Sequence, residues 1–222
     1  MINTFNETQL HRTLKNLYSP GDSGTERAVE GFICDIYDGH AIIEIQTGHF
    51  GALKHKLEKL LPMYRITIVY PVAENAYIRM LNEDGSLRSY RKSPKHGNRY
   101  QIFKELLSIA EYTEYPNLSI EILYIDCEVI KIDDKKGRSR YKNPRIIDKR
   151  LLKINGEEHI VKSGRLVIPL FDKLPYRFIS SDIRKLGSGV YTSYMISFLK
   201  KIKKIEFDTK EGRWSVYKKT GA

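Results

Sequence analysis

The sequence predicts an α/β domain in which helices flank a β-sheet, followed by a small C-terminal winged helix-turn-helix. Residues 32–47 contain two β-branched and aromatic runs on either side of Asp38-Gly39, which is typical of a β-hairpin. A helical pattern at 49–61 and a strand pattern at 64–70 follow, and this order favours a crossover onto one sheet. Near the C-terminus, 178–217 shows helix, turn, helix and two short strands, the order of a winged helix-turn-helix.

The predicted hairpin brings two acids together. If Gly39-His40 forms the loop, Asp35 lies directly across from Glu44; if Asp38-Gly39 forms it, Asp35 lies one diagonal step away on the same face. Gln46 comes two residues after Glu44 and faces the same side. Either register therefore predicts a pair of neighbouring carboxylates with an amide beside them.

Two adjacent carboxylates on a half-buried sheet repel each other unless a cation neutralises them. Oxygen ligands with no His or Cys cluster nearby favour a hard ion, so we expect Mg²⁺ or Mn²⁺ at Asp35 and Glu44. The alternative is a solvated sheet face, on which the two acids are simply the polar positions of an alternating strand pattern and bind no ion.

A third carboxylate is predicted from the segment 25–37, which reads as one extended strand. Gly31 is a candidate bulge that would turn Glu30 toward Asp35.

The remaining helices and strands follow from apolar spacing and from turn residues. An amphipathic helix is expected at 7–18, with Asn6 as its cap and Leu10, Leu14 and Leu17 on one stripe. The other expected elements are two short strands around Glu83-Asp84-Gly85, a helix at 100–112, a strand at 118–132, and helices at 178–186 and 190–204 joined by Gly187-Ser-Gly189.

Positive charge is concentrated in the second half of the chain. Residues 1–130 contain 14 Lys and Arg against 17 Asp and Glu, whereas 131–153 contain 10 against 3 and 175–222 contain 11 against 4. Clustered positive charge is typical of proteins that bind polyanions, although a solvated basic surface has the same composition. The predicted organisation is an α/β domain at 1–132, a basic linker or arm at 133–160, and a winged-helix domain at 161–222.

Duplex DNA is the expected partner because the winged helix places its second helix in the major groove. Candidates for base contacts lie at the start of that helix: Ser188, Tyr191, Thr192 and Ser193. Candidates for phosphate contacts are Arg91, Lys92, Lys95 and Arg99 in a basic loop and Lys200, Lys201, Lys203, Lys204, Lys210 and Arg213 in the C-terminal part. A helix–hairpin oligomerisation module is the alternative for the C-terminal part, and an RNA-binding protein is the alternative partner class.

Several classes of protein are not favoured. No apolar run approaches the roughly 18 residues of a membrane helix, and the N-terminus lacks a secretory pattern, so we expect no membrane association and a cytoplasmic location. The two cysteines, Cys34 and Cys127, have no paired spacing and are expected to be buried apolar side chains.

The chain resembles the PD-(D/E)XK, or restriction-endonuclease-like, nuclease superfamily. Asp35 on one strand and Glu44-Ile-Gln on the next match its short motif. Val29-Glu-Gly-Phe-Ile-Cys-Asp35, Glu44-Ile-Gln-Thr47 followed by Phe50 and Lys54 to Leu57, Arg91-Lys-Ser-Pro-Lys and the C-terminal module together look like a group of uncharacterised bacterial proteins that couples such a core to a winged helix.

The resemblance implies a restriction-endonuclease-like mixed sheet and a metal-dependent nuclease that hydrolyses DNA. Asp35, Glu44 and the Ile45 carbonyl would hold the metal, Glu30 would complete the shell, and Gln46 would position the attacking water. Gln46 stands where the superfamily usually has Lys, and either Glu30 or Asp35 matches the first motif carboxylate. A non-catalytic DNA-binding regulator on a degenerate nuclease scaffold is the alternative, and a homodimer that cuts both strands is compatible with either.

Overall fold

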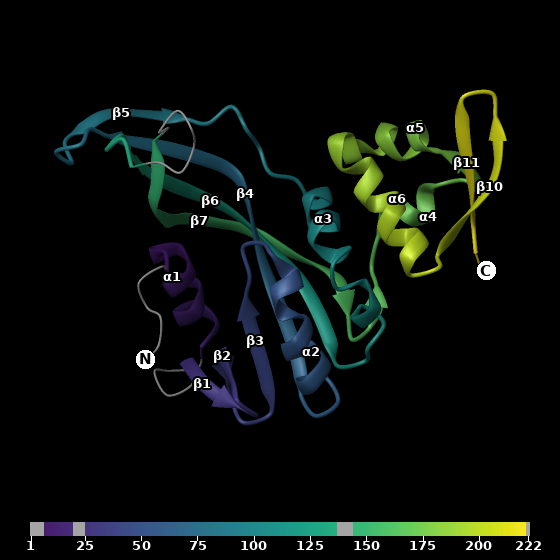
Figure 1. Cartoon of the computed structure of the whole chain (residues 1–222), viewed down its shortest axis with the longest axis horizontal. Coiled ribbons are helices and arrows are strands. Elements are labelled where there is room, and N and C mark those ends of the chain that lie inside the picture. The colour runs from purple at the N-terminus through teal and green to yellow at the C-terminus, as the bar shows by residue number, and fades with distance from the viewer. Residues whose placement is uncertain (1–6, 20–24, 137–143, 221–222) are drawn as a thin grey trace. The chain divides into compact units, whose positions relative to one another are not determined.

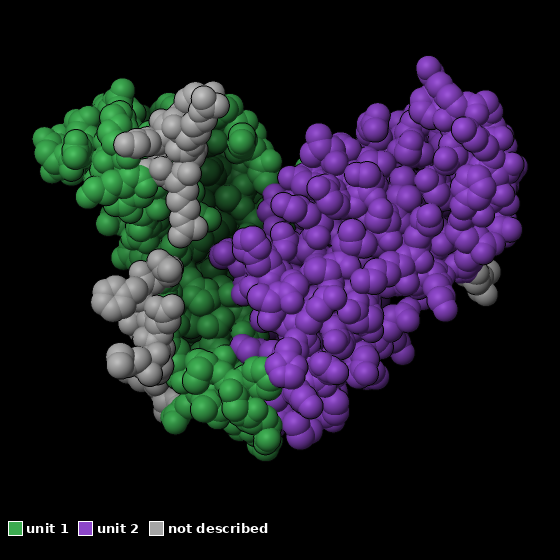
Figure 2. Space-filling view, viewed as in Figure 1, with its two compact units in different colours: residues 1–45, 71–98, 122–158 green, residues 46–70, 99–121, 159–222 purple. Residues whose placement is uncertain are grey.

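A computed structural model of the protein describes residues 7–19, 25–136 and 144–220. The predicted cap Asn6 therefore lies outside the described residues. The chain forms two compact units, coloured separately in Figure 2, which are described one at a time. Unit 1 comprises 1–45, 71–98 and 122–158, and unit 2 comprises 46–70, 99–121 and 159–222.

Figure 1 labels the main elements along the chain. The strands are β1 (Thr25–Val29), β2 (Phe32–Tyr37), β3 (Ala41–Ile45), β4 (Arg65–Leu81), β5 (Leu87–Lys92), β6 (Leu118–Ile132), β7 (Arg145–Lys162), β8 (Arg165–Leu166), β9 (Arg177–Ile179), β10 (Ile205–Glu211) and β11 (Trp214–Lys219). The α-helices are α1 (Gln9–Tyr18), α2 (Lys54–Leu60), α3 (Ile102–Leu106), α4 (Pro169–Lys173), α5 (Ser180–Ile183) and α6 (Thr192–Lys201). Short helical turns are η3 (Phe50–Leu53), η4 (Arg99–Gln101), η5 (Ala110–Tyr112), η6 (Arg184–Ser188) and η7 (Gly189–Tyr191).

The fold is mixed α/β, as the sequence predicts, with a large mixed sheet flanked by helices. In the described residues the main sheet has eight strands in the order β1-β2-β3-β4-β6-β7-β8, and β5 pairs with β4. The strand predicted at 118–132 is β6 with the same bounds, because its alternating β-branched residues are buried along most of its length.

In unit 1 the hairpin of β2 and β3 is formed as expected. Ile36 pairs with Ile43 and Tyr37 with Ile42, so Gly39-His40 is the loop, and Asp38 Oδ1 accepts the His40 N–H at 2.8 Å. Helix α1 lies against β2 and β3 through its buried Leu10 and Leu14, two members of the predicted stripe.

Helix α1 is fixed at its N-terminus by two side chains. Thr8 is the N-cap and accepts the His11 N–H at 3.3 Å. Asp148 on β7 accepts the Gln9 N–H at 2.8 Å, so a carboxylate lies at the positive end of the helix.

In unit 2 the helix predicted at 49–61 is formed by η3 and α2. All five of its predicted apolar positions are buried: Phe50, Leu53, Leu57, Leu60 and Leu61. Helix α6 packs on α3, with the rings of Phe103 and Phe198 5.5 Å apart.

The C-terminal part of unit 2 has a second sheet of three strands, among the described residues, in the order β10-β11-β9. Its chain order is α4, β9, α5, a turn, α6 and the β10–β11 hairpin. The predicted turn between α5 and α6 is present, and Gly187 and Gly189 adopt positive φ values of 100° and 52° there.

Four predicted elements differ from the structure. Residues 25–37 form two strands and a turn instead of one bulged strand, and the stretch predicted as a linker or arm at 133–160 contains most of β7. Charged residues on β7 obscured its strand pattern, since both of its faces are largely exposed there. The predicted helices at 100–112 and 190–204 are shorter; Lys203, with φ of 55°, lies beyond the end of α6.

Cys34 and Cys127 are both free and buried, which agrees with their predicted packing role. Among the described residues, no helix has the length and apolar composition needed to span a bilayer.

Candidate functional site

Three acids lie on neighbouring strands of unit 1. The register of β2 and β3 continues from the pair Ile36–Ile43 to place Asp35 opposite Glu44. Between β1 and β2, the pairs Thr25–Ile36 and Arg27–Cys34 leave Glu26 opposite Asp35. We call Glu26, Asp35 and Glu44 the acid row. The sequence predicted the Asp35–Glu44 proximity correctly, in the first of its two registers, but not the place of Glu26.

Glu30 does not belong to this row. Glu30 and Gly31 form a two-residue turn between β1 and β2, with φ values of 47° and 82°, and Val29 pairs with Phe32. Asp35 lies three residues farther along β2, about 10 Å from the turn at roughly 3.3 Å per residue. The exposed Glu30 therefore cannot complete a metal shell at Asp35, and the predicted bulge at Gly31 is corrected to a turn.

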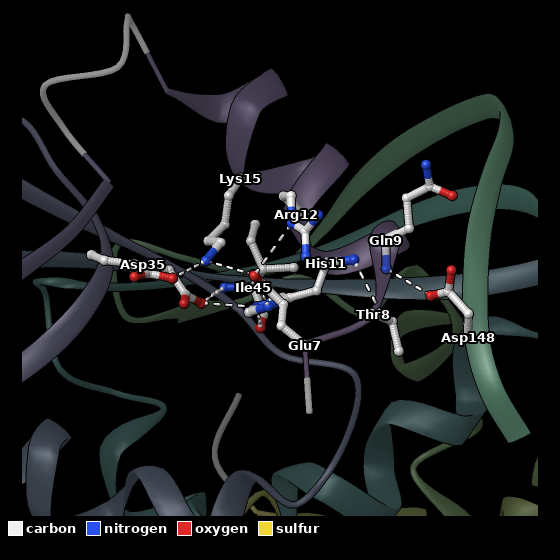
Figure 3. A network of polar contacts seen from close by, with 10 residues as sticks. Glu7, Thr8, Gln9, His11, Arg12, Lys15, Asp35, Ile45 and Asp148 are labelled. Atoms are coloured by element: carbon white, nitrogen blue, oxygen red, sulfur yellow. Dashed lines mark hydrogen bonds and ion pairs between the residues drawn. The ribbon is translucent and has the colours of Figure 1, made fainter. Parts of the chain in front are cut away.

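Asp35 and Ile45 both bind His11, which lies on helix α1 (Figure 3). Asp35 Oδ2 accepts the Ile45 N–H at 2.8 Å, and it also accepts a hydrogen bond from His11 Nε2 at 3.2 Å. The same Nε2 donates to the Ile45 carbonyl at 2.9 Å. Thus the Asp35 carboxylate and the Ile45 carbonyl, two of the predicted metal ligands, converge on one nitrogen atom.

The imidazole of His11 carries a positive charge in this arrangement. Its Nδ1 lies 2.9 Å from Glu7 Oε1, so each ring nitrogen faces only acceptors and each must donate. Burial lowers the pKa of His11, but the hydrogen bond and charge of Asp35 and the charge of Glu7 outweigh burial and raise it.

Lys15, one turn farther along α1, neutralises the other end of the row. It is buried, and its Nζ lies 2.5 Å from Glu7 Oε1 and 2.7 Å from Glu26 Oε1. Burial lowers the pKa of Lys15, but its hydrogen bonds to Glu26 and Glu7 reverse the effect and raise it. The cations of α1 therefore alternate with carboxylates from Glu26 through to Asp35.

The acids respond to these cations. Burial raises the pKa of Asp35, yet the hydrogen bond and charge of His11, with the Ile45 N–H, lower it overall. Glu44 is buried, with 4% of its surface exposed, beside this charged network. Positive groups therefore keep the Asp35 carboxylate ionised. A bound metal cation would have the same effect.

The donor set is compatible with a hard ion through oxygen atoms only. Among residues 7–19, 25–136 and 144–220, no three His, Cys, Asp or Glu side chains lie close enough to hold a metal together. Mg²⁺, however, binds through one or two carboxylates and takes its other ligands from water and substrate phosphate. Asp35 and the Ile45 carbonyl, which converge on one nitrogen atom, and Glu44, which lies opposite Asp35, offer oxygen atoms of this type.

Gln46 belongs to unit 2, and its side chain has a local partner. The Gln46 N–H donates to the Val69 carbonyl at 2.9 Å, and its Nε2 donates to the Gly48 carbonyl at 2.8 Å. The role of Gln46 in positioning water stays a prediction.

Part of the predicted basic loop lies on strand β5. Arg91 and Lys92 end β5, and together with Lys95 they are exposed. Arg99 begins η4 and is half-buried. The role of the exposed cations as phosphate contacts stays a prediction.

Two predicted base contacts are buried. Ser188 is fully buried and Thr192 is 3% exposed, and their hydroxyls lie 2.6 Å apart. Thr192 Oγ1 also donates to the Gly189 carbonyl at 2.7 Å. These hydroxyls hold the turn before α6, so they are removed from the candidates for base contact. Ser193 is exposed and Tyr191 half-buried, and both remain candidates.

The predicted phosphate contacts of the C-terminal part divide into engaged and exposed cations. Lys204 lies 3.2 Å from Glu114 Oε1, and Lys201 lies 3.2 Å from Glu111 Oε2. Three other lysines are exposed and form no ion pair with a carboxylate in the described residues: Lys200, Lys203 and Lys210. The Arg213 guanidinium lies 4.7 Å from the centre of the Trp214 ring.

Sequence reasoning missed His11, Lys15, Glu7 and the role of Glu26. A signal existed in the helix predicted at 7–18, where Glu7, His11 and Lys15 follow each other at a spacing of four. In the structure Glu7 lies just before α1, ahead of its N-cap Thr8. The pattern does not say which strand these side chains cover.

The fold and the acid row define a mixed α/β protein with carboxylates aligned across adjoining strands. Residues 8–161 match the family described as domain of unknown function DUF8091, and the chain belongs to that family. It is 46% identical over 220 residues to an uncharacterised protein of Treponema pallidum (strain Nichols), an alignment that covers 98% of this chain and 87% of the relative. No solved structure matches the chain.

Proposed function

We propose that the protein is a divalent-metal-dependent nuclease that hydrolyses DNA, with a site related to that of PD-(D/E)XK enzymes. The observation that carries the proposal is the convergence of Asp35 Oδ2 and the Ile45 carbonyl on a single cationic nitrogen, at 3.2 and 2.9 Å, with Glu44 opposite Asp35. A pair of oxygens that already binds one positive group is suited to bind another.

Asp35, Glu44 and the Ile45 carbonyl would hold Mg²⁺ or Mn²⁺. When bound, the ion lowers the pKa of a coordinated water and offsets negative charge on the scissile phosphate. Gln46 Oε1 would accept a hydrogen bond from the attacking water and orient it, because Gln46 Nε2 is already occupied by Gly48.

The C-terminal part would bring this site to duplex DNA. Its chain order, with β9 paired to β11 beside the β10–β11 hairpin, supports a winged helix in which α6 enters the major groove. Ser193 and Tyr191 would meet base edges, whereas Lys200, Lys203, Lys210 and Arg213 would meet phosphates.

A second function has its own observation in support. His11 already satisfies Asp35 and Ile45, and Gln46 replaces the usual lysine, so a non-catalytic DNA-binding regulator on the same scaffold would need no ion. Such a protein would bind DNA equally well with and without divalent ions.

The test is incubation of the full chain with supercoiled, linear, single-stranded and branched DNA in Mg²⁺, in Mn²⁺ and in EDTA. We expect cleavage with either ion and none in EDTA. Glu44→Gln should abolish cleavage, and Glu30→Gln, which changes an acid outside the row, should leave it unaltered. DNA binding without cleavage under every condition would favour the regulator.

A further inference from the structure

We propose that the imidazole of His11 occupies the place of the divalent ion, so that Mg²⁺ binds only when the ring is displaced. This inference rests on the proposed function. It concerns one atom, His11 Nε2, which donates to Asp35 Oδ2 at 3.2 Å and to the Ile45 carbonyl at 2.9 Å (Figure 3).

The imidazole and the ion cannot share these oxygens. Mg²⁺ lies about 2.0–2.1 Å from its oxygen ligands, so an ion bound to both atoms would fall in the space that the Nε2–H group occupies. The ring must therefore leave before the ion can bind both oxygens.

The ring is held in place by a residue that lies just before its own helix. Nδ1 binds Glu7, which precedes the N-cap Thr8, and Glu7 also binds Lys15 on α1, which in turn binds Glu26 on β1. Displacement of His11 therefore breaks a contact to Asp35 and loosens a network that ties α1 to two strands. Metal affinity and the docking of α1 should be coupled, and the coupling should lower the affinity for Mg²⁺.

The experiment is calorimetric titration of the full chain with Mg²⁺, comparing wild type with His11→Ala and His11→Gln. Removal of the competing cation should tighten Mg²⁺ binding by about tenfold in His11→Ala, the magnitude of one hydrogen bond to a charged group. His11→Gln keeps a neutral donor and should give a smaller gain, and it also serves if the alanine variant does not fold.

Arg12→Gln is the matched control. It removes a positive charge from the next position of α1, but the Arg12 side chain is 64% exposed, and its guanidinium lies 3.7 Å from Glu7 Oε2. Its Mg²⁺ affinity should stay within about twofold of wild type, since an exposed charge acts weakly at a distance. An equal gain in Arg12→Gln and His11→Ala would overturn the proposal, because general electrostatics would then explain both.

A second readout follows the ring itself in wild-type protein labelled with ¹⁵N-histidine. The hydrogen-bonded Nε2 proton of His11, assigned by its loss in His11→Gln, should disappear as Mg²⁺ is added. If it persists at saturating Mg²⁺, the ring and the ion do not compete. Weaker Mg²⁺ binding in His11→Ala would also overturn the proposal, since it would make the ring a ligand.

Failure of this inference is distinguishable from failure of the proposed function. Mg²⁺ binding that is lost in Glu44→Gln but unchanged in both His11 variants would overturn the competition and keep the metal site. If wild type and all variants bind no Mg²⁺, both fail. Binding by His11→Ala but not by wild type would support both.

Discussion

Lys15 shows how one residue connects the stability of this protein to its site. Its side chain is 6% exposed, and its ammonium group binds Glu7 and Glu26, whose side chains are 15% and 32% exposed. Removing one partner from a buried ion pair lowers stability more than replacing the whole pair by apolar residues, because the remaining charge stays desolvated and unpaired.

We expect Lys15→Met to lower the free energy of unfolding by about 2 kcal/mol, less than for fully buried pairs because both carboxylates reach solvent. Urea denaturation in EDTA measures this free energy of unfolding. Arg12→Met, at an exposed position of the same helix, is the control and should change stability by less than about 0.5 kcal/mol. Equal losses in the two variants would mean that Lys15 is not specifically engaged.

The ion pair between Lys15 and Glu7 predicts that the stability of the protein depends on pH. Burial raises the pKa of Glu7, but the hydrogen bond and charge of Lys15, with those of His11, lower it overall. A carboxyl whose folded pKa is depressed adds stability above its unfolded pKa, and that stability is lost as pH falls through the folded value. Wild type should therefore lose stability below about pH 4.5, the ordinary value for this carboxyl. In Lys15→Met this acid-side loss should be smaller; a loss as steep as in wild type would contradict the assignment.

At the scale of elements, two hairpin turns form a natural comparison. Gly31, after Glu30, and Gly164, after Ser163, both follow a residue with positive φ and have φ values of 82° and 74°. A Cβ at Gly31 would meet nothing within 4 Å, but one at Gly164 would lie 2.6 Å from the Tyr115 carbonyl oxygen.

Gly31→Ala should cost about 1 kcal/mol, the strain of a left-handed alanine. Gly164→Ala should cost clearly more, about 3 kcal/mol or greater, because backbone in unit 2 must also shift. Thermal or urea unfolding of the pair measures the difference. Equal losses would mean that the turn at Gly164 has room to relax.

The turn before α6 gives a second prediction at this scale. Thr192→Val keeps the shape of the side chain but deletes a hydroxyl bonded to Ser188 and Gly189, so we expect a loss of stability of about 1–2 kcal/mol. Preference among DNA sequences should not change. An altered preference with normal stability would return Thr192 to the candidates for base contact.

At the scale of the whole molecule, binding to duplex DNA should depend on salt through its exposed cations. Replacing Lys200 and Lys203 together by Gln should weaken binding to all sequences and reduce the slope of log K against log salt by about 2. The control is Lys201 and Lys204, which carry the same charge but contact Glu111 and Glu114, and whose replacement should reduce the slope less. Fluorescence anisotropy at several salt concentrations checks both; salt-independent binding would argue against phosphate contacts.

The sequence by itself determined the mixed α/β fold, strand β6, the apolar face of η3 and α2, and the presence of Asp35 and Glu44 as neighbours on one face. These features follow from local rules: alternation on a strand, spacing on a helix, and a turn that fixes the register of the two strands beside it. The same rules misassigned Glu30, because Glu-Gly reads equally well as a bulge or as a two-residue turn.

Only the tertiary structure decided what neutralises the acids. Glu7, His11 and Lys15 share one face of a helix in any reading of the sequence, but the strands beneath that face are set by how Leu10 and Leu14 pack on β2 and β3. His11 meets Asp35 across 24 residues and Ile45 across 34 residues of chain. Such contacts depend on the docking of whole elements, which minimises exposed apolar surface over the entire unit, and no local pattern encodes that result.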